Sequence, residues 1–193
     1  MHKHRWFALL FCFAFCCLAQ AQRARYNFNP GWLLKVGDDP AAANPDFDDS
    51  GWKHVTLPHA WNEDFAYRVA IYDQPTGIAW YRKHFSVPNV PKNGRVFIEF
   101  QGARQAAGVF LNGHRLGLSE NGVMAFGFDL TPFLVPGENV LAVRSDNAWD
   151  YREKDTNATV QWNNRNFYSN FGGLNKNVWL HVTPAVHQTL PLY

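Results

Sequence analysis

The sequence predicts an all-β fold, an antiparallel β-sandwich. Short runs of aromatic and β-branched residues recur along the chain, and turn residues, among 14 Gly and 11 Pro, separate them. No amphipathic helical pattern longer than about two turns lies between these runs, so the helical crossovers that parallel strands need are missing. With 193 residues, 47% of them hydrophobic and 18% charged, the chain is large enough to bury a core. Its composition excludes a disordered tail or a coiled coil.

Residues 1–21 are predicted to be a secretory signal peptide. A basic start, Met1–Arg5, is followed by the apolar run from Trp6 to Leu18 and by the small-residue cleavage site Ala19–Ala21. The apolar run is shorter than the roughly 18 residues that a membrane-spanning helix needs. We therefore expect cleavage after Ala21 and export from the cell, with lipidation of a leader cysteine as the alternative.

Removal of this leader leaves a chain without net charge and without cysteine. All 3 cysteines lie within it, so no disulfide or thiolate chemistry is expected afterwards. It also contains Lys3 and Arg5, so 16 of the 18 basic side chains remain and balance 16 acidic ones. Nucleic acid and anionic membranes are bound through clustered basic residues, so neither is expected as a partner of the mature chain. A neutral ligand is more consistent with this balance.

The first two clear strands are predicted over residues 78–87 and 95–100. The first is rich in aromatic and β-branched residues and ends at a proline. The second alternates: its even-numbered residues are apolar and face one way, whereas Arg95, Phe97 and Glu99 face the other. This alternation is typical of a strand in a sandwich.

A tight hairpin is predicted next, with strands over 107–111 and 115–118. The connecting Asn112-Gly113 pair favours a type I′ turn, because both residues accept positive φ. Three further strands are predicted over residues 124–130, 139–144 and 177–183. Two long polar stretches, 38–54 and 145–170, are predicted to be loops carried by this scaffold.

The carboxylates do not form a pattern that predicts hydrolysis by this chain. A glycosidase needs two carboxyl groups about 5 to 9 Å apart across the scissile bond. The Asn62-Glu63 pair resembles the Asn-Glu pair that carries the acid in many barrel glycosidases, but it lies in an early loop and not at the end of a barrel strand. Glu99 and Glu138 lie in or beside predicted strands and are interpreted as outward, solvated carboxylates.

Motifs for a nucleophile, a metal or a cofactor are also missing. There is no G-x-S-x-G elbow, and no His-x-His pair has suitable carboxylates beside it. His84 and His181 are interpreted as ordinary strand side chains or polar groups of the core. No catalytic residue, metal or cofactor is therefore predicted.

The loop over 145–170 carries the composition of a sugar-binding surface. It interleaves aromatic residues, Trp149 among them, with Asn, Asp and Arg side chains. Aromatic rings pack against the C–H faces of a pyranose, and amide, carboxylate and guanidinium groups bind its hydroxyls. The alternative is that these aromatic residues cover the open end of the sandwich, and the composition does not decide between the two.

Seven segments together resemble the N-terminal sugar-binding domain of glycoside hydrolase family 2, the group of β-galactosidases, β-glucuronidases and β-mannosidases. They occur in the order of the family and cover nearly all of the mature chain. The segments are Asn29–Trp32, Asp48–Trp61, Pro75–Phe85, Phe110–Gly117, Met124–Thr131, Pro136–Val143 and Gly172–Leu180. The leader and the ending H-Q-T-L-P-L-Y are similar to exported bacterial members of the β-galactosidase type, which implies a periplasmic or extracellular location.

The resemblance implies a jelly-roll sandwich over residues 22–184, with 185–193 as the start of a linker. Complete members continue into an immunoglobulin-like domain and a (β/α)8 barrel whose two glutamates perform retaining hydrolysis. We therefore expect a domain without the catalytic residues, which binds a β-galactoside-like carbohydrate and completes the active site of the barrel. A free-standing lectin-like module is the alternative, because sandwiches host such functions widely.

The resemblance also implies contact residues for the terminal sugar. The residue before Pro75-Thr76-Gly77 is such a contact, and it is Gln74 here where similar β-galactosidases commonly have Asn. A second family contact, an aspartate ahead of Gly173, falls on Phe167 by counting, which is a departure from the family. The substitutes expected for it are Asn164, Arg165 and Asn166 on the same loop, and Asp73 on the first loop. Trp149 is expected as an aromatic contact from the composition of the 145–170 loop.

Overall fold

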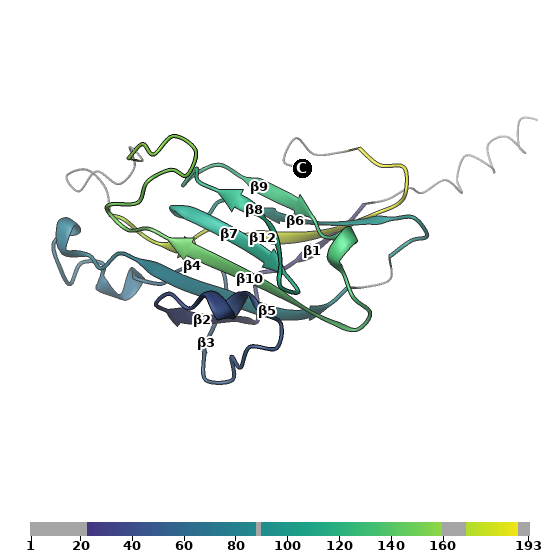
Figure 1. Ribbon diagram of the computed structural model, residues 1–193, viewed down its shortest axis with the longest axis horizontal. Coiled ribbons are helices and arrows are strands. Elements are labelled where there is room, and N and C mark those ends of the chain that lie inside the picture. Colours follow the sequence, from purple (N-terminus) through teal and green to yellow (C-terminus); the bar gives the residue numbers. More distant parts are fainter. Residues whose placement is uncertain (1–22, 88–89, 160–168, 189–193) are drawn as a thin grey trace, which may run out of the picture.

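Two antiparallel sheets pack face to face in this protein (Figure 1). The computed structural model describes residues 23–87, 90–159 and 169–188. The smaller sheet consists, in spatial order, of β1 (Ala24–Asn27), β12 (Val178–Thr183), β6 (Arg95–Phe100) and β9 (Phe126–Asp129). The larger sheet consists of β3 (Lys53–Val55), β2 (Trp32–Val36), β5 (Ile78–Ser86), β10 (Glu138–Asp146), β7 (Ala106–Leu111) and β8 (His114–Ser119).

Short elements complete the architecture. A two-stranded sheet pairs β4 (His59–Ala60) with β11 (Gly173–Leu174). Single-turn 3-10 helices in the described connections are η1 (Pro40–Ala43), η2 (Glu63–Phe65), η3 (Ile71–Asp73) and η4 (Thr131–Phe133). All named strand pairs run antiparallel, which confirms the predicted all-β sandwich. Nowhere in the described ranges is there a helix with the length and apolar character needed to cross a bilayer.

The predicted hairpin is present. β7 and β8 flank Asn112 and Gly113, whose φ angles of 50° and 82° are the positive values that a type I′ turn requires. The strand predicted over 95–100 has those bounds as β6. β10 is longer than predicted, because its last residues, Ser145 and Asp146, continue the pairing with both β5 and β7.

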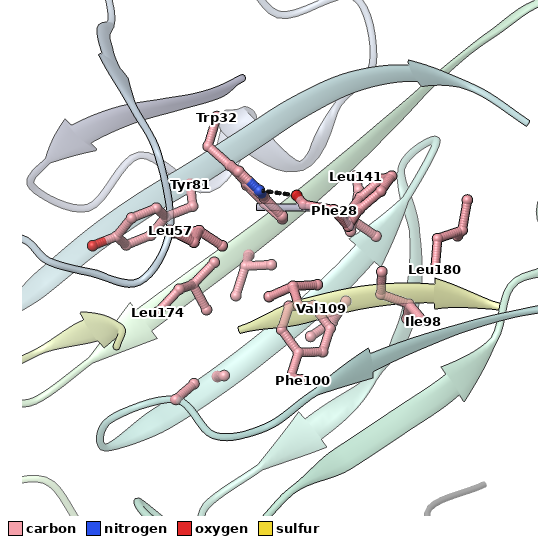
Figure 2. Packing of buried hydrophobic residues seen from close by; sticks show 14 of the residues in the cluster. Phe28, Trp32, Leu57, Tyr81, Ile98, Phe100, Val109, Leu141, Leu174 and Leu180 are labelled. Carbon is pink, nitrogen blue, oxygen red and sulfur yellow. Dashed lines mark hydrogen bonds between the residues drawn. The ribbon is translucent and has the colours of Figure 1, made fainter. Parts of the chain in front are cut away.

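The core lies between the inner faces of the two sheets (Figure 2). As predicted, the even-numbered residues of β6 face inward, and Ile98 and Phe100 have no exposed surface. From the other sheet Trp32 is fully buried, and its indole Nε1 donates to the Phe28 carbonyl at 2.8 Å. The Trp32 and Phe28 rings meet edge to face with centroids 6.0 Å apart. Each such buried side chain stabilises the fold by about 1.5–3 kcal/mol, so this core suffices without a disulfide in the described residues.

One carboxylate prediction was wrong. Glu99, expected to be solvated, is only 9% exposed, and its Oε2 lies 2.7 Å from Nε2 of His181 on the neighbouring strand. The outer face of the smaller sheet is covered by side chains, including the His187 ring, whose centroid lies 5.5 Å from that of Phe97. A carboxylate shielded from water in this way needs a partner, which His181 supplies. The Glu138 side chain, by contrast, is 67% exposed, as predicted.

The 38–54 stretch is a loop for most of its length, and Arg82 fixes it to the larger sheet. Arg82 lies on the outer face of β5 and is fully buried. Its Nε donates to Asp49 Oδ2 at 2.6 Å, and its remaining nitrogens donate to main-chain carbonyls between residues 42 and 47. A single guanidinium group thereby joins one carboxylate and four main-chain carbonyls of the loop to the larger sheet.

His84 lies between two carboxylates and is expected to make stability depend on pH. Its Nε2 is 2.9 Å from Asp49 Oδ2 and its Nδ1 is 3.1 Å from Glu138 Oε1. Burial alone would lower the pKa of His84, but the hydrogen bonds to Asp49 and Glu138 together raise it above 6.5. The contribution to stability is therefore fully present below pH 6.5 and is lost as pH rises through the raised pKa.

The test compares wild type with His84→Gln in urea unfolding at pH 6 and pH 8. We expect the wild-type advantage to shrink at pH 8, by less than about 1 kcal/mol because the imidazole is partly exposed. Glu138→Gln should lower the pKa of His84 itself, which NMR titration of the ring protons measures. An equal wild-type advantage at both pH values would contradict the assignment.

Candidate functional site

The predicted contact residues Asp73, Gln74 and Trp149 lie at one end of the sandwich. Ile78, the first residue of β5, pairs with Asp146, the last residue of β10. Asp73 and Gln74 precede the one and Trp149 follows the other, so all three lie at this end of the sandwich. The predicted contacts Asn164, Arg165 and Asn166 fall outside the described residues.

Gln74 is buried beside a hollow of about 220 Å³. Its side chain is 4% exposed, and its Nε2 donates to the Asn62 carbonyl at 3.5 Å. Its Oε1 is buried and accepts no hydrogen bond. An unpaired buried carbonyl costs about 1–3 kcal/mol, and the described residues supply no donor that offsets this cost. The hollow is lined by Phe65, Ala66, Tyr67, Val69, Ala70, Ile71, Gln74, Ser169 and Phe171.

A second hollow, of about 290 Å³, adjoins the first. The two share Ala66 and Phe171. The second is lined by Pro58, His59, Ala60, Glu63, Ala66, Phe171 and Asn175. Asp73, which is exposed, and Trp149, which is partly buried, are not among the described residues that line either hollow.

Three buried asparagines, Asn62, Asn147 and Asn170, tie the loops around Gln74 together. Each has no exposed surface. Asn62 Nδ2 donates to the Pro75 and Asn170 carbonyls, at 2.7 and 2.8 Å, and its Oδ1 accepts from the Gly172 amide at 3.0 Å. One side chain thus joins the segment that follows Gln74 to the segment that precedes β11.

Asn147 and Asn170 extend this amide cluster to the end of β10. Asn147 Oδ1 accepts from the Trp61 indole at 3.2 Å and from the Gly77 amide at 3.1 Å. Asn147 and Asn170 each donate from the side chain to the carbonyl of the other, at 2.8 and 2.7 Å. The contact is close enough that a Cβ at position 172 would lie 2.3 Å from the Asn147 side chain, so only glycine fits there.

Electrostatically, the pair of hollows is neutral to acidic. The described lining residues include no lysine or arginine. Burial lowers the pKa of His59, although Glu63 opposes this, so the imidazole is neutral near pH 7. Glu63 supplies the negative charge, and its Oε1 lies 3.8 Å from His59 Nε2. Such a lining is suited to hydroxyl donors and opposes a carboxylate.

Residues of the second hollow were not predicted as contacts from the sequence. His59 and Asn175 come together because β4 pairs with β11. In this pairing Leu174, the neighbour of Asn175, lies opposite His59, although the two are far apart in the chain. Glu63 was considered as a catalytic acid and set aside. In the ranges that the structure describes, no three His, Cys, Asp or Glu side chains converge to hold a metal ion.

An apolar rim surrounds the first hollow. Phe65, Val69 and Ile71 are 43, 40 and 48% exposed, and Tyr67 is fully exposed. Scattered apolar side chains are common on protein surfaces, but four within seven residues form a patch that a partner or ligand can cover.

Residues 69–179 match the family described as glycosyl hydrolase 2 galactose-binding domain-like. A β-glucuronidase of Formosa agariphila is 36% identical to this chain over 186 residues, which cover 91% of this chain and 19% of that protein. The β-galactosidase BoGH2A of Bacteroides ovatus is 39% identical over 173 residues, covering 86% of this chain and 19% of that protein. The chain therefore spans about a fifth of the length of these relatives.

Solved structures resemble the same region. A β-glucuronidase from glycoside hydrolase family 2 superposes with a TM-score of 0.79 at 34% identity, over 91% of this chain and 19% of that one. The crystal structure of a β-glucuronidase from Bacteroides uniformis gives a TM-score of 0.71 at 32% identity, over 84% of this chain and 18% of that one. In both cases the matched part is one fraction of a much larger chain.

Proposed function

Because this chain belongs to the galactose-binding-like domains of glycosyl hydrolase family 2, we propose that it is the non-catalytic carbohydrate-binding domain of a β-galactosidase-like retaining glycoside hydrolase. In this function it binds the terminal sugar and completes the active site that a downstream barrel provides. The enzyme that contains it acts in carbohydrate breakdown outside the cytoplasm, consistent with the predicted leader.

The observation that carries the proposal is that the side-chain oxygen of Gln74 has no hydrogen-bond partner. Its Oε1 is buried and unpaired beside a hollow whose other walls are mainly apolar. A pyranose offers hydroxyl donors at its edge and C–H groups on its faces, which suit this oxygen and the rings of Phe65 and Phe171. Asp73, Trp149, Asn164, Arg165 and Asn166 stay predictions.

The charge of the lining favours a galactoside over a glucuronide. Relatives named for either substrate match this chain about equally well. A glucuronide carries a carboxylate, which would need a cationic partner, and the described residues that line the hollow beside Gln74 include no lysine or arginine. Arg165, a predicted contact outside the described residues, is the cation that would reverse this preference if it reached the sugar. A neutral sugar has no charge to desolvate and therefore needs no cationic partner.

The apolar rim supports a role as one part of a larger enzyme. Phe65, Tyr67, Val69 and Ile71 are exposed at the mouth of the hollow. Burial of this rim against the remainder of the glycosidase, an immunoglobulin-like domain and a barrel, would remove it from water and place Gln74 at the junction. The alternative, a free-standing lectin-like module, leaves the rim in contact with solvent or glycan.

Substitution of Gln74 tests the proposal. We expect Gln74→Leu to weaken binding of methyl β-D-galactopyranoside to the purified chain about tenfold, because the change removes the acceptor Oε1 at similar volume. Titration followed by NMR chemical shifts measures the affinity. Methyl β-D-glucuronide, titrated in parallel, should bind more weakly than the galactoside.

A matched control is available in Gln105. It is also fully buried, and both atoms of its amide lack a hydrogen-bond partner, but it does not line either hollow. Gln105→Leu should leave galactoside binding unchanged. Equal losses in the two variants, or no loss in Gln74→Leu, would contradict the role assigned to Gln74.

A further inference from the structure

We propose that Asn121 is a site of spontaneous deamidation, in which its side-chain amide is converted to a carboxylate. The sequence contains Asn-Gly pairs at Asn93, Asn112 and Asn121. Glycine after asparagine leaves the attacking backbone nitrogen unhindered, because glycine has no Cβ. All three pairs therefore have the local sequence that permits the reaction, and the fold decides which of them reacts.

The reaction needs only the chain and water. The Gly122 amide nitrogen loses its proton and bonds to Cγ of Asn121, and the Cγ–Nδ2 bond breaks, so that Nδ2 leaves with a proton as ammonia. The product is a cyclic succinimide. Water then opens this ring at one of its two carbonyl carbons and gives either aspartate or isoaspartate, with nothing oxidised or reduced.

The fold polarises the side-chain carbonyl of Asn121. Its Oδ1 accepts from the amides of Val123 and Met124, at 3.2 and 3.1 Å. Negative charge develops on this oxygen when a nucleophile adds to Cγ, and backbone N–H groups around such an oxygen stabilise the charge. The residue is exposed, and in the described part of the chain its Nδ2 has no hydrogen-bond partner, so nothing retains the ammonia.

The attacking nitrogen of Gly122 is also available. Although Gly122 is buried, its N–H donates no hydrogen bond within the described ranges. The segment lies between β8 and β9, so no strand pairing has to break when the ring forms. Val123 and Met124, which follow, are 41 and 63% exposed, and the loop can move with them.

At Asn93 the corresponding nitrogen is held by the fold. The Gly94 N–H donates to the Pro91 carbonyl at 2.7 Å. The surroundings are tight, because a Cβ at position 94 would lie 2.5 Å from the Thr183 carbonyl oxygen. The nitrogen has to give up its hydrogen bond and move within packed atoms before it can reach Cγ. Asn93 should therefore react more slowly than Asn121, although it is exposed as well.

At Asn112 the side chain itself is held. Its Nδ2 donates to the Phe133 carbonyl at 2.9 Å and to Asn139 Oδ1 at 2.8 Å, and its Oδ1 accepts from the Val140 amide at 2.8 Å. Both protons of Nδ2 are used, so this nitrogen cannot leave without the loss of two hydrogen bonds. Asn112 should therefore also react slowly.

The isoaspartyl product has a structural consequence. Glu120 Oε1 accepts from the Tyr151 hydroxyl at 2.5 Å and from the Lys154 amide at 2.8 Å. Isoaspartate lengthens the main chain directly after Glu120 and should displace its carboxylate from these donors. Hydrogen exchange of the amides of residues 151–154 should therefore be faster in the isoaspartyl form than in Asn121→Asp, which keeps the length of the main chain. Equal exchange would contradict this consequence.

Incubation of the folded chain at pH 8, followed by peptide mass spectrometry, tests the proposal. Each deamidation adds about 1 Da and gives aspartyl and isoaspartyl peptides that chromatography separates. We expect Asn121 to react about tenfold faster than Asn93 or Asn112 in the folded chain. In the chain unfolded with urea the three rates should lie close together, because the three pairs then differ only in their neighbours along the sequence.

Two variants test the roles assigned to Gly122 and Asn121. Gly122→Ala adds a Cβ that would lie 3.6 Å from the Gln105 side chain, an ordinary contact that the fold can accept. This Cβ hinders the attacking nitrogen and should slow the reaction at Asn121 about tenfold. Asn121→Ser keeps an oxygen that can accept from the loop amides but has no carbonyl to attack, so the main mass gain should disappear.

The contrary results are equally definite. If Asn93 or Asn112 reacts as fast as Asn121 in the folded chain, or if the preference for Asn121 is as strong in urea, the fold does not select the site and the proposal is wrong. An unchanged rate in Gly122→Ala would also overturn it, and so would a folded chain that stays unmodified at Asn121 while the unfolded chain reacts.

Discussion

Arg82→Met is expected to destabilise the protein by about 3–5 kcal/mol. The change leaves the Asp49 carboxylate, whose side chain is 11% exposed, without the guanidinium 2.6 Å away. Burial alone would raise the pKa of Asp49, but the hydrogen bonds from Arg82 and His84 together lower it, and in the variant only the contact with the partly exposed His84 remains. The main-chain carbonyls of the 42–47 segment lose their donor as well. Urea unfolding at pH 7 measures the loss.

Arg82→Met is also expected to loosen one particular part of the protein, the 42–47 segment. Ala42 and Trp52 belong to a small apolar cluster on the outer face of the larger sheet, together with Trp80 and Ala142. Without Arg82 the 42–47 segment keeps this cluster but loses its side-chain donor to the main chain, so hydrogen exchange of the amides of residues 42–47 should accelerate. Arg82→Lys should recover little stability, because an ammonium cannot reach several acceptors in a planar fork.

An exposed ion pair provides the control for Arg82. Arg95 Nη1 lies 2.9 Å from Asp129 Oδ2, but the Arg95 side chain is 48% exposed. Arg95→Met should cost no more than about 1 kcal/mol, because water screens both charges. If the two substitutions cost the same, Arg82 does not anchor the loop.

Elements with local signals could be predicted from the sequence. The alternation in β6 and the Asn112-Gly113 turn are contained within a few residues, and both were predicted correctly. β4 and β11 have two residues each and exist only because they pair with one another across the chain. No local pattern reveals such a pairing. Glu99 was misjudged for a related reason, since alternation gives the face of a strand but not what covers that face.

In the candidate site, too, some residues could be named from the sequence and others could not. Gln74 was named as a sugar contact through its place before Pro75-Thr76-Gly77, and the structure puts it in the wall of a hollow, whereas its contact with sugar stays a prediction. The buried amides were not predicted, because Asn residues in loops are normally turn residues, and Asn62 finds its partner Gly172 110 positions away. The sequence drew attention to the Asn62-Glu63 pair but not to what each residue does. The fold shows that Asn62 is buried and bonds to the neighbouring loops, whereas Glu63 lines the second hollow.

Asn62→Asp is the second large effect that we expect, a loss of about 3–5 kcal/mol at pH 7. The carboxylate is isosteric with the amide, but it directs an oxygen instead of an NH₂ group at the Pro75 and Asn170 carbonyls, now 2.7 and 2.8 Å away. Three acceptors would then meet in a fully buried place with no donor between them. The Gly172 hydrogen bond alone would survive.

The loss of stability in Asn62→Asp should also depend on pH. A pH dependence distinguishes the effect of a buried charge from that of altered packing. The repulsion raises the folded-state pKa of the new carboxyl above its unfolded value of about 3.9. The penalty is therefore full above the raised pKa and shrinks as pH falls toward 3.9, where the protonated carboxyl can donate again. Unfolding of wild type and variant at pH 7 and pH 4.5 measures this difference.

The control and the functional consequence complete the case for the amide cluster. Asn121→Asp makes the same exchange at an exposed position whose Oδ1 only accepts, from the Val123 and Met124 amides, so it should change stability by less than about 0.5 kcal/mol at either pH.

Asn62 joins the Gln74 segment to the segment before β11, which lines both hollows through Phe171. Sugar binding by folded Asn62→Asp should therefore weaken at pH 7 even though residue 62 touches neither hollow. Unchanged binding would mean that these loops keep their geometry without the cluster.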